Sequence, residues 1–354
     1  MKVPNKIMVV RPDRMGDVIL SIPSLLAIKN ADHLATVSFF LREPIASLMK
    51  VQKYIDSVFV YEPSGKHKGF SGLFTLIGEI KKLQLDQVIF LNSSFKISLA
   101  FLLARVKKRV GNLSKWYSFL FYTEGIRQNR SESVKNEAQY GLDLVKKSGF
   151  SVGDFYCELS LPESALLGAS EWLKAQNLSQ IDVLIHPGMG GSALNVNFKN
   201  YLNLSKKLQS NGHQVVFSVG PLEDNLAKQI KEELPQVPIF EGGGLVLDFL
   251  RFAGIIKNST VVIAPSTGPL HLAAALGARV IGFYPPIQVQ RKLRWGPYIR
   301  SKDHQKIFSP KVNCPAKYSC VGSSCEHYPC MEMLVTQDKT EIILAQIKKW
   351  IYEK

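Results

Sequence analysis

Two short polar turns in this chain contain residue types that can do chemistry. The first turn reads Arg11-Pro-Asp13-Arg14-Met-Gly16-Asp17, and the second reads Ser266-Thr267-Gly268-Pro-Leu-His271. Each follows an apolar stretch typical of a buried strand and precedes a stretch typical of a helix. A carboxylate near a helix start can act as a general base, and free backbone N–H groups at a helix start can bind an anion. The pair suggests an enzyme that joins two substrates.

The first turn offers Asp17 as the general base. Gly16, directly before it, lets a substrate approach the backbone closely. The alternative is that Asp17 only caps the following helix, which is a common role for aspartate. Asp13 follows a proline and is better explained by the chemistry of the turn.

Three turns in the second half could hold a phosphate or a sugar. Thr267 and Gly268 stand where a helix presents its free N–H groups, and His271 lies one helical turn further on. The other two turns are the glycine-rich His186-Pro-Gly188-Met-Gly190-Gly191 and the acidic Gly220-Pro-Leu-Glu223-Asp224. Glycines permit close backbone approach to a ligand, and carboxylates at a strand end often bind ribose hydroxyls. The alternative for these turns is ordinary helix capping, with His271 as a buried core residue.

These turns must be positioned by a scaffold, and apolar strand patterns alternate with amphipathic helix patterns along the chain. The alternation predicts an α/β fold with parallel sheets. Strands are expected at Lys6–Val10, Thr36–Leu41, Ser57–Tyr61, Gln87–Leu91, Arg109–Val110, Asp182–His186, Gln214–Val219, Pro238–Phe240, Thr260–Ala264 and Arg279–Phe283. Helices are expected at Val18–Lys29, Leu73–Leu83, Phe95–Arg105, Ser133–Lys147, Lys199–Ser210, Glu223–Glu233, Val246–Ile256 and Pro269–Leu276.

A length of 354 residues suggests two domains. The pattern loosens around Gly149–Pro162, where we expect a linker. We therefore predict two doubly wound domains, 1–160 and 161–335, whose ligands bind beyond the carboxyl ends of the strands. The tail, 336–354, contains an expected helix at Lys339–Ile351, which we predict packs back on the first domain.

The net charge of +15 favours anionic partners such as phosphorylated substrates or an anionic membrane surface. Nucleic acid is disfavoured, because the chain has no zinc finger, RNA-recognition signature or long basic block. No apolar stretch is long enough to cross a membrane, and the N-terminus lacks a signal-peptide pattern, so we expect a cytoplasmic protein.

Basic and aromatic residues gather in the first half, around Lys66, Lys115-Trp-Tyr and Arg127. One interpretation is contact with a phosphorylated acceptor glycolipid and the anionic inner face of the membrane. The other is a solvated basic surface with a few core aromatics.

Four of the five cysteines fall in one stretch, at Cys314, Cys320, Cys325 and Cys330. Their spacing differs from that of common zinc sites, so a structural role is expected and a structural metal is the alternative.

Taken together, the residues and the order of these motifs resemble those of glycosyltransferase family 9, the ADP-heptose:lipopolysaccharide heptosyltransferases. The motifs are Arg11-x-x-Arg-Met-Gly-Asp17-Val, His186-Pro-Gly-Met-Gly-Gly and Ser266-Thr-Gly-Pro-Leu-His-Leu-Ala-Ala-Ala-Leu-Gly. The resemblance extends over nearly the whole chain. It implies a GT-B fold, in which two Rossmann-like domains face an interdomain cleft.

The resemblance also implies an inverting heptose transfer from ADP-heptose to the lipopolysaccharide inner core, without a metal or another cofactor, peripheral on the cytoplasmic face of the inner membrane. Asp17 would be the catalytic base. Residues of the first half would bind the acceptor: Arg11, Arg14, Gly16, Lys66, Lys115 and Arg127. Residues of the second half would bind the nucleotide sugar: His186, Gly188, Gly190, Gly220, Glu223, Ser266, Thr267, Gly268 and His271.

Two positions depart from the family pattern. Ser266 stands where the family usually has Asp, and Leu194 stands where it usually has Lys or Arg. A charged contact of this kind with the leaving diphosphate typically contributes about 1.5–3 kcal/mol. Lys199 is the nearest basic replacement. These departures leave open a different nucleotide sugar or acceptor, or a degenerate protein that binds without turnover.

Overall fold

The computed structural model describes residues 5–191, 193–242 and 245–352. The chain divides into two compact units. The first unit runs to Arg130 and resumes at Lys135–Cys157, and the second consists of Ser131–Val134 and Glu158–Lys354. The chain therefore enters the second unit briefly before it returns to complete the first.

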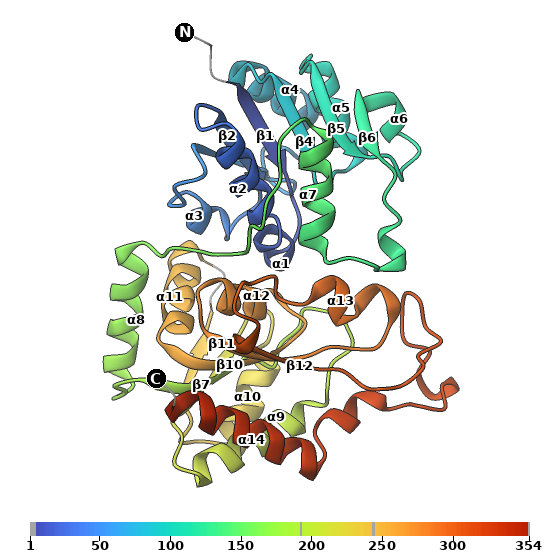
Figure 1. Ribbon diagram of the computed structural model, residues 1–354. Coiled ribbons are helices and arrows are strands. Elements are labelled where there is room, and N and C mark those ends of the chain that lie inside the picture. Colours follow the sequence, from blue (N-terminus) through green and yellow to red (C-terminus); the bar gives the residue numbers. More distant parts are fainter. Residues whose placement is uncertain (1–4, 192, 243–244, 353–354) are drawn as a thin grey trace. The chain divides into compact units, whose positions relative to one another are not determined.

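The first unit is built on a six-stranded sheet in the order β3-β2-β1-β4-β5-β6, with every neighbouring pair parallel (Figure 1). The strands are β1 (Lys6–Val10), β2 (Thr36–Leu41), β3 (Ser57–Val60), β4 (Gln87–Phe90), β5 (Lys108–Asn112) and β6 (Glu124–Ile126). The central strand β1 is an apolar run, as expected for a strand buried on both faces.

Helices cover both faces of this sheet. The longer ones are α2 (Ile22–Ala31), α4 (Ser71–Leu83), α5 (Phe95–Leu103) and α7 (Glu137–Lys147), and the short ones are α1 (Met15–Ile19), α3 (Ala46–Met49) and α6 (Ser118–Phe121). On one face, α4 packs on α5 and α5 on α6. The buried residues of α4 and α5 form one core cluster with Met8 and Val10 of β1. On the other face α2 packs on α7.

The second unit repeats the design, with the strand order β12-β11-β10-β7-β8-β9 and parallel pairs throughout. Its strands are β7 (Ile181–Ile185), β8 (Val215–Val219), β9 (Ile239–Glu241), β10 (Ser259–Pro265), β11 (Arg279–Phe283) and β12 (Gln305–Phe308). Both sheets place their first strand beside the middle of the order, where the direction of the strand order reverses. Ligands bind at this point in doubly wound folds.

The helices of the second unit are α8 (Glu163–Ala175), α9 (Phe198–Ser210), α10 (Asp224–Glu233), α11 (Val246–Lys257), α12 (Gly268–Ala275), the short α13 (Lys292–Trp295) and α14 (Gln337–Tyr352). Helix α11 packs on α8 and on α12. Residues of α9, α10 and α14 share a single core cluster with β7, β8, β10 and β11.

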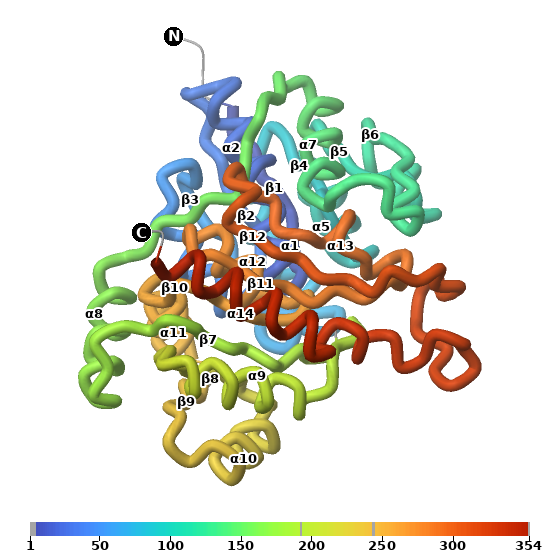
Figure 2. Tube along the Cα trace, turned by 60° about the horizontal axis from the view of Figure 1, so that its bottom comes forward, coloured from blue at the N-terminus to red at the C-terminus, as the bar shows by residue number. Residues whose placement is uncertain are grey.

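The predicted position of the last helix was wrong. Ile343, Ile347 and Trp350 of α14 are buried in the core of the second unit, and Figure 2 shows the helix lying across its strands. These three side chains follow a helical spacing, so they form one apolar face that the second sheet buries. The sequence pattern identified the helix correctly but could not identify the surface that it covers.

Other differences have local causes. The helix expected at Val18–Lys29 is two helices, because Pro23 stands at the start of α2 and lacks the N–H that a continuous helix would need. The helix expected from Ser133 begins only at Glu137, where Asn136 and Gln139 form a capping box. Two edge strands, β6 and β12, and the helix α8 were not predicted.

Candidate active site

Asp17 lies just beyond the carboxyl end of β1, in the first turn of α1. The N-cap position of α1 is occupied by Arg14, so Asp17 does not cap the helix. Its carboxylate is 20% exposed. The alternative interpretation of Asp17 as an N-cap is therefore wrong, and the side chain is available for chemistry at the edge of the sheet.

Arg11 fixes the position of the Asp17 side chain. Its guanidinium is only 4% exposed, and its Nη2 donates a hydrogen bond to Asp17 Oδ1. Nη1 donates to Glu137 Oε1 at 3.0 Å, and Nε lies 2.8 Å from Asp13 Oδ2. Arg130 Nη1 donates to the same Glu137 oxygen at 2.6 Å. Two guanidinium groups thus face three carboxylates in the first unit, which leaves one net negative charge.

The electrostatics of this cluster keep Arg11 charged. Burial alone would lower the pKa of Arg11, but the carboxylates of Asp17, Glu137 and Asp13 outweigh it and raise the pKa. Burial raises the pKa of Asp13, against the opposing effect of Arg11. Because Asp13 also accepts a hydrogen bond from Asn92 Nδ2 at 2.9 Å, it is held in place on two sides.

The predicted acceptor residues fall into two groups. Arg14, Gly16 and Lys115 lie near the Arg11 cluster, because Lys115 Nζ bonds Ser93 O at 2.5 Å beside Asn92. Burial lowers the pKa of Lys115. Lys66 and Arg127 lie in loops that follow β3 and β6, the two outer strands, so the structure does not bring them together.

In the second unit, the glycine-rich turn and the acidic turn meet where β7 and β8 end. Glu223 Oε2 accepts a hydrogen bond from Gly220 N at 2.7 Å. A Cβ added to Gly188 would stand 2.0 Å from the Glu223 carboxylate oxygens, so the Glu223 side chain can lie over this residue only because it is glycine. Gly190 has a φ of +54°, which also favours glycine. His186 Nδ1 lies 3.0 Å from Ser218 Oγ, and burial lowers the pKa of His186, which favours a neutral imidazole.

The second predicted turn forms the start of α12, as expected. Thr267 is the N-cap residue and Gly268 the first residue of the helix, while Thr267 and His271 are both buried. Ser266, in place of the family's usual Asp, donates a hydrogen bond to the hydroxyl of Tyr284, which donates in turn to Trp295 O at 2.7 Å. Ser266 therefore belongs to a neutral hydrogen-bonded chain in the position where the family usually has a charge.

Leu194, the second position that departs from the family pattern, also has neutral groups beside it. Asn195, next to Leu194, donates through Nδ2 to Pro187 O at 3.0 Å and accepts from Tyr201 OH at 2.8 Å. Lys199 is exposed near the start of α9, and together with Lys206 it lowers the pKa of Glu233. Glu233 is the last residue of α10, whereas Glu223, the predicted donor residue, precedes the first. Lys199 therefore interacts with the end of α10 that is further from Glu223.

The four clustered cysteines line a single small cavity together with Leu194, His327 and Tyr328. All are free thiols. Burial raises the pKa of Cys330, and the other three cysteines raise it further. Within the described ranges, no group of three or more His, Cys, Asp or Glu side chains is arranged to hold a metal ion.

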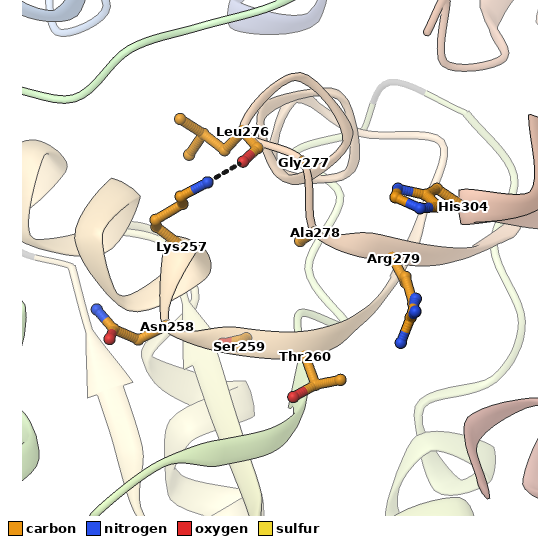
Figure 3. Close-up of a pocket in the computed structure, with 9 residues that line it drawn as sticks. All are labelled: Lys257, Asn258, Ser259, Thr260, Leu276, Gly277, Ala278, Arg279 and His304. Atoms are coloured by element: carbon orange, nitrogen blue, oxygen red, sulfur yellow. Dashed lines mark hydrogen bonds between the residues drawn. The ribbon is translucent and has the colours of Figure 1, made fainter. Parts of the chain in front are cut away.

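A cavity of about 360 Å³ lies at the opposite edge of the second sheet (Figure 3). It is lined by Lys257, Asn258, Ser259, Thr260, Leu276, Gly277, Ala278, Arg279 and His304, which are at or near the starts of β10, β11 and β12. Lys257 Nζ donates to Leu276 O at 2.8 Å, just after the end of α12. A cation at a helix C-terminus is stabilising, so Lys257 has a structural explanation, and the cavity is separate from the predicted donor residues.

The sequence did not reveal the partners of Arg11. Glu137, with a side chain 1% exposed, comes from the helix expected at Ser133–Lys147, and Arg130 comes from the basic segment that precedes it. A buried Glu at the start of an amphipathic helix is the one local signal that could have identified Glu137 as a partner of a cation, because a charge is seldom buried without a partner.

Comparison with known proteins identifies the family of the chain. The profile described as Glycosyltransferase family 9 (heptosyltransferase) matches residues 73–321. One similar protein, from Haemophilus influenzae, is provisionally named a glycosyltransferase. It is 29% identical to this chain over 318 residues, which cover 86% of this chain and 89% of that protein.

Solved structures match over nearly the full length. The glycosyl transferase family 9 structure from Veillonella parvula has a TM-score of 0.81 at 18% identity, and the match covers 100% of this chain and 99% of that chain. The ADP-heptose LPS heptosyltransferase II of E. coli has a TM-score of 0.76 at 17% identity, with 97% and 99% covered.

Two parallel sheets with helices on both faces, matched at full length by these structures, define a GT-B glycosyltransferase fold with two Rossmann-like domains. Within that class, the profile match over more than half of the sequence shows that the chain belongs to glycosyltransferase family 9, and that it is a glycosyltransferase. The matched range begins after Asp17, so the role of that residue depends on its geometry.

Proposed function

We propose that this protein transfers a heptose from ADP-heptose to the inner core of lipopolysaccharide, with inversion and without a metal. The observation that carries the proposal is the Asp17 carboxylate, held through Oδ1 by the buried Arg11 at the carboxyl end of β1. A carboxylate that is oriented in this way is suited to accept a proton through its other oxygen, Oδ2.

In the proposed reaction, Asp17 takes the proton from an acceptor hydroxyl as that oxygen forms its bond to the anomeric carbon. The bond between the anomeric carbon and the diphosphate breaks on the opposite face of the sugar, and ADP leaves with the electron pair. The first unit would bind the acceptor, and Arg14, Gly16 and Lys115 would contact it near the base.

The second unit would bind the donor. The backbone N–H groups at the start of α12, beside Thr267 and Gly268, would stabilise the departing diphosphate. Glu223, which lies over Gly188, would accept hydrogen bonds from the ribose hydroxyls. The heptosyltransferase II of E. coli, whose fold this chain shares, bears ADP-heptose and LPS in its name, which supports the choice of donor and acceptor.

A different nucleotide sugar is the second candidate. Ser266 and Asn195 are neutral groups in or beside positions where the family usually has charge, and both are built into hydrogen-bonded networks. A donor site with fewer charges would tolerate a different leaving group or sugar. The reaction class and the role of Asp17 would be the same.

The test is product formation measured by mass spectrometry. The purified protein is incubated with ADP-heptose and a heptose-free lipopolysaccharide acceptor, with Asp17→Asn as the variant. We expect a heptose mass increment that requires Asp17. Turnover with another nucleotide sugar, and none with ADP-heptose, would support the second candidate. An increment that Asp17→Asn retains would overturn the proposed base.

A further inference from the structure

The first unit exposes a group of large apolar side chains on and beside α4, α5 and α6. We define this aromatic patch as Phe70, Phe74, Phe95, Trp116, Phe119 and Leu120. Their exposed fractions run from 43% for Phe95 to 76% for Phe70. Large apolar side chains that are this exposed, and grouped together, indicate an interaction surface.

The members of the patch come from neighbouring elements. The rings of Phe70 and Phe74 lie 5.1 Å apart, and those of Phe95 and Trp116 lie 5.8 Å apart. Lys96, next to Phe95, donates a hydrogen bond to Gly69 O, next to Phe70, at 2.7 Å. Since α5 packs on both α4 and α6, the two ring pairs and the exposed residues of α6 lie on one face of the unit.

The patch lies toward the edge of the sheet that carries Asp17. Helix α4 begins after β3 and α5 begins after β4, so Phe70 and Phe95 stand at the carboxyl ends of parallel strands. Asp17 follows β1, which pairs directly with β4. The exposed aromatics and the proposed base therefore share one edge of the first unit.

The charges around the patch are mainly positive. Residues 63–78 contain two Lys and no Asp or Glu, and residues 87–123 contain six Lys or Arg and no Asp or Glu. Lys66 pairs with two acids just outside these ranges, Glu62 at 3.6 Å and Glu79 at 3.1 Å, whereas Lys68 and Lys115 are exposed in the segments that directly precede Phe70 and Trp116. A surface with exposed rings and an excess of positive charge complements an anionic, partly apolar partner.

A second group of exposed apolar residues provides a contrast. Leu167 of α8 and Leu247 of α11 are 57% and 74% exposed in the second unit. Their helices carry three acidic residues, Glu163, Glu171 and Asp248, and three basic residues, Lys174, Arg251 and Lys257. A surface with balanced charge gains no net attraction to an anionic partner, so the excess of positive charge distinguishes the aromatic patch.

We propose that the aromatic patch docks the first unit on a lipid bilayer that contains anionic headgroups. Trp116 and the phenylalanines enter the interfacial layer, where aromatic rings partition favourably, and the neighbouring lysines contact the headgroup phosphates. The inference deepens the proposed function and rests on it in one respect, that docking presents Asp17 to an acceptor anchored in the same bilayer.

The first experiment measures binding to vesicles and needs no turnover. The protein is sedimented with vesicles of phosphatidylcholine, with or without phosphatidylglycerol. We expect binding that requires the anionic lipid, and the double variant Trp116→Ser, Phe119→Ser should partition at least about tenfold more weakly. The matched control, Leu167→Ser with Leu247→Ser, should bind like the unchanged protein. Equal melting temperatures of the variants confirm that both remain folded.

Fluorescence provides a second readout. The chain has four tryptophans, all within the part that the structure describes, and Trp116 is the one that is exposed. Lipids that carry bromine on their acyl chains should quench it, and Trp116→Phe should remove the quenching while it retains binding. Absence of binding to anionic vesicles, or binding that the patch variant retains, overturns the proposal. So does a dimer that the patch variant converts to a monomer, or an oligonucleotide complex that this variant loses.

Transfer assays separate this inference from the proposed function. With a deacylated, water-soluble acceptor, the patch variant should turn over as fast as the unchanged protein, whereas with an acceptor embedded in vesicles it should be slower. If no nucleotide sugar gives product, the proposed function fails while the vesicle results still decide on the docking surface.

Discussion

The carboxyl edges of the two sheets differ in the charge of the groups that they bring together. The edge of the first sheet gathers full charges, in which Arg11 and Arg130 face Asp13, Asp17 and Glu137. The edge of the second sheet has mainly neutral groups at the start of α12, namely Thr267, Gly268 and the buried His271. The same fold thus supplies a charged cluster in one unit and a neutral cradle in the other.

In the proposed function, the two edges would divide the work of a transfer reaction. A proton acceptor must be charged and precisely oriented, and the pairing with Arg11 would orient Asp17 for that role. A cradle for an anion benefits from fixed backbone dipoles, which need no counter-charge and do not change with pH. Changes at the first edge should therefore alter the rate and the stability, and changes at the second should alter donor affinity.

The largest expected effect is on turnover. Asp17→Asn keeps the shape of the side chain but removes its basicity, so kcat should fall by about 10²–10⁴-fold with little change in donor affinity. Steady-state rates and donor titrations measure the two quantities separately. Asp143→Asn, an exposed acid in the same unit, is the control and should leave kcat unchanged. Equal loss in both variants would contradict the charged-edge interpretation.

The next effect is on stability. Arg11→Met removes the cation from three carboxylates, and leaving buried charges without their partner typically costs about 3–5 kcal/mol. Urea unfolding should show this loss. The exposed pair of Lys206 and Glu233 offers the comparison, since exposed ion pairs contribute little and Lys206→Met should cost far less than Arg11→Met. Similar costs for the two variants would show that the Arg11 cluster is no more than a surface pair.

At the second edge, Gly188→Ala should reduce donor binding. The added Cβ would displace the Glu223 carboxylate from its position over Gly188, so any contact that this carboxylate makes with the donor would be weakened. Isothermal titration with the nucleotide sugar or its nucleotide measures the change. Gly242→Ala, whose Cβ would meet its nearest atom at 3.5 Å, is the matched control. Unchanged affinity in Gly188→Ala would remove Glu223 from the donor site.

The smallest effect is a pH dependence of the second unit. Burial depresses the pKa of His186 below its unfolded value of about 6.5. At a pH between the folded and the unfolded pKa, the unfolded chain therefore binds more protons than the folded one. This contribution to stability is present at neutral pH and is lost as the pH falls below about 6.5. Unfolding measured from neutral to mildly acidic pH should show a shallower decline in His186→Gln. An identical decline in both proteins would mean that His186 does not titrate in this range.

The sequence predicted those parts of the fold that have local signals. The central strands β1, β7 and β10 are apolar runs with polar turns at their ends, and both the strands and the turns occur where they were expected. The short edge strands β6 and β12 were missed, because three or four partly exposed residues carry almost no periodic signal. The family assignment was confirmed by the profile and the structures.

The candidate site could be predicted only in part, for a similar reason. Asp17 and Thr267 stand out because each lies at a strand-to-helix turn. Arg11, which holds Asp17, is six positions away in the chain, but Glu137, which holds Arg11, is 126 positions from it. Pairing at that distance is created by the packing of α7 beside α2, which a single sequence does not encode in any local pattern. The roles of the site residues are still predictions.

Residues 131–134 belong to the second unit although the first unit continues after them. Glu132 pairs there with Lys317 at 2.7 Å and accepts a hydrogen bond from Gln288 Nε2 at 3.0 Å. A recombinant fragment that starts at residue 158 would therefore lack part of its own unit. Exchange of the whole second unit between relatives would need two grafts: the long C-terminal segment and this four-residue insert.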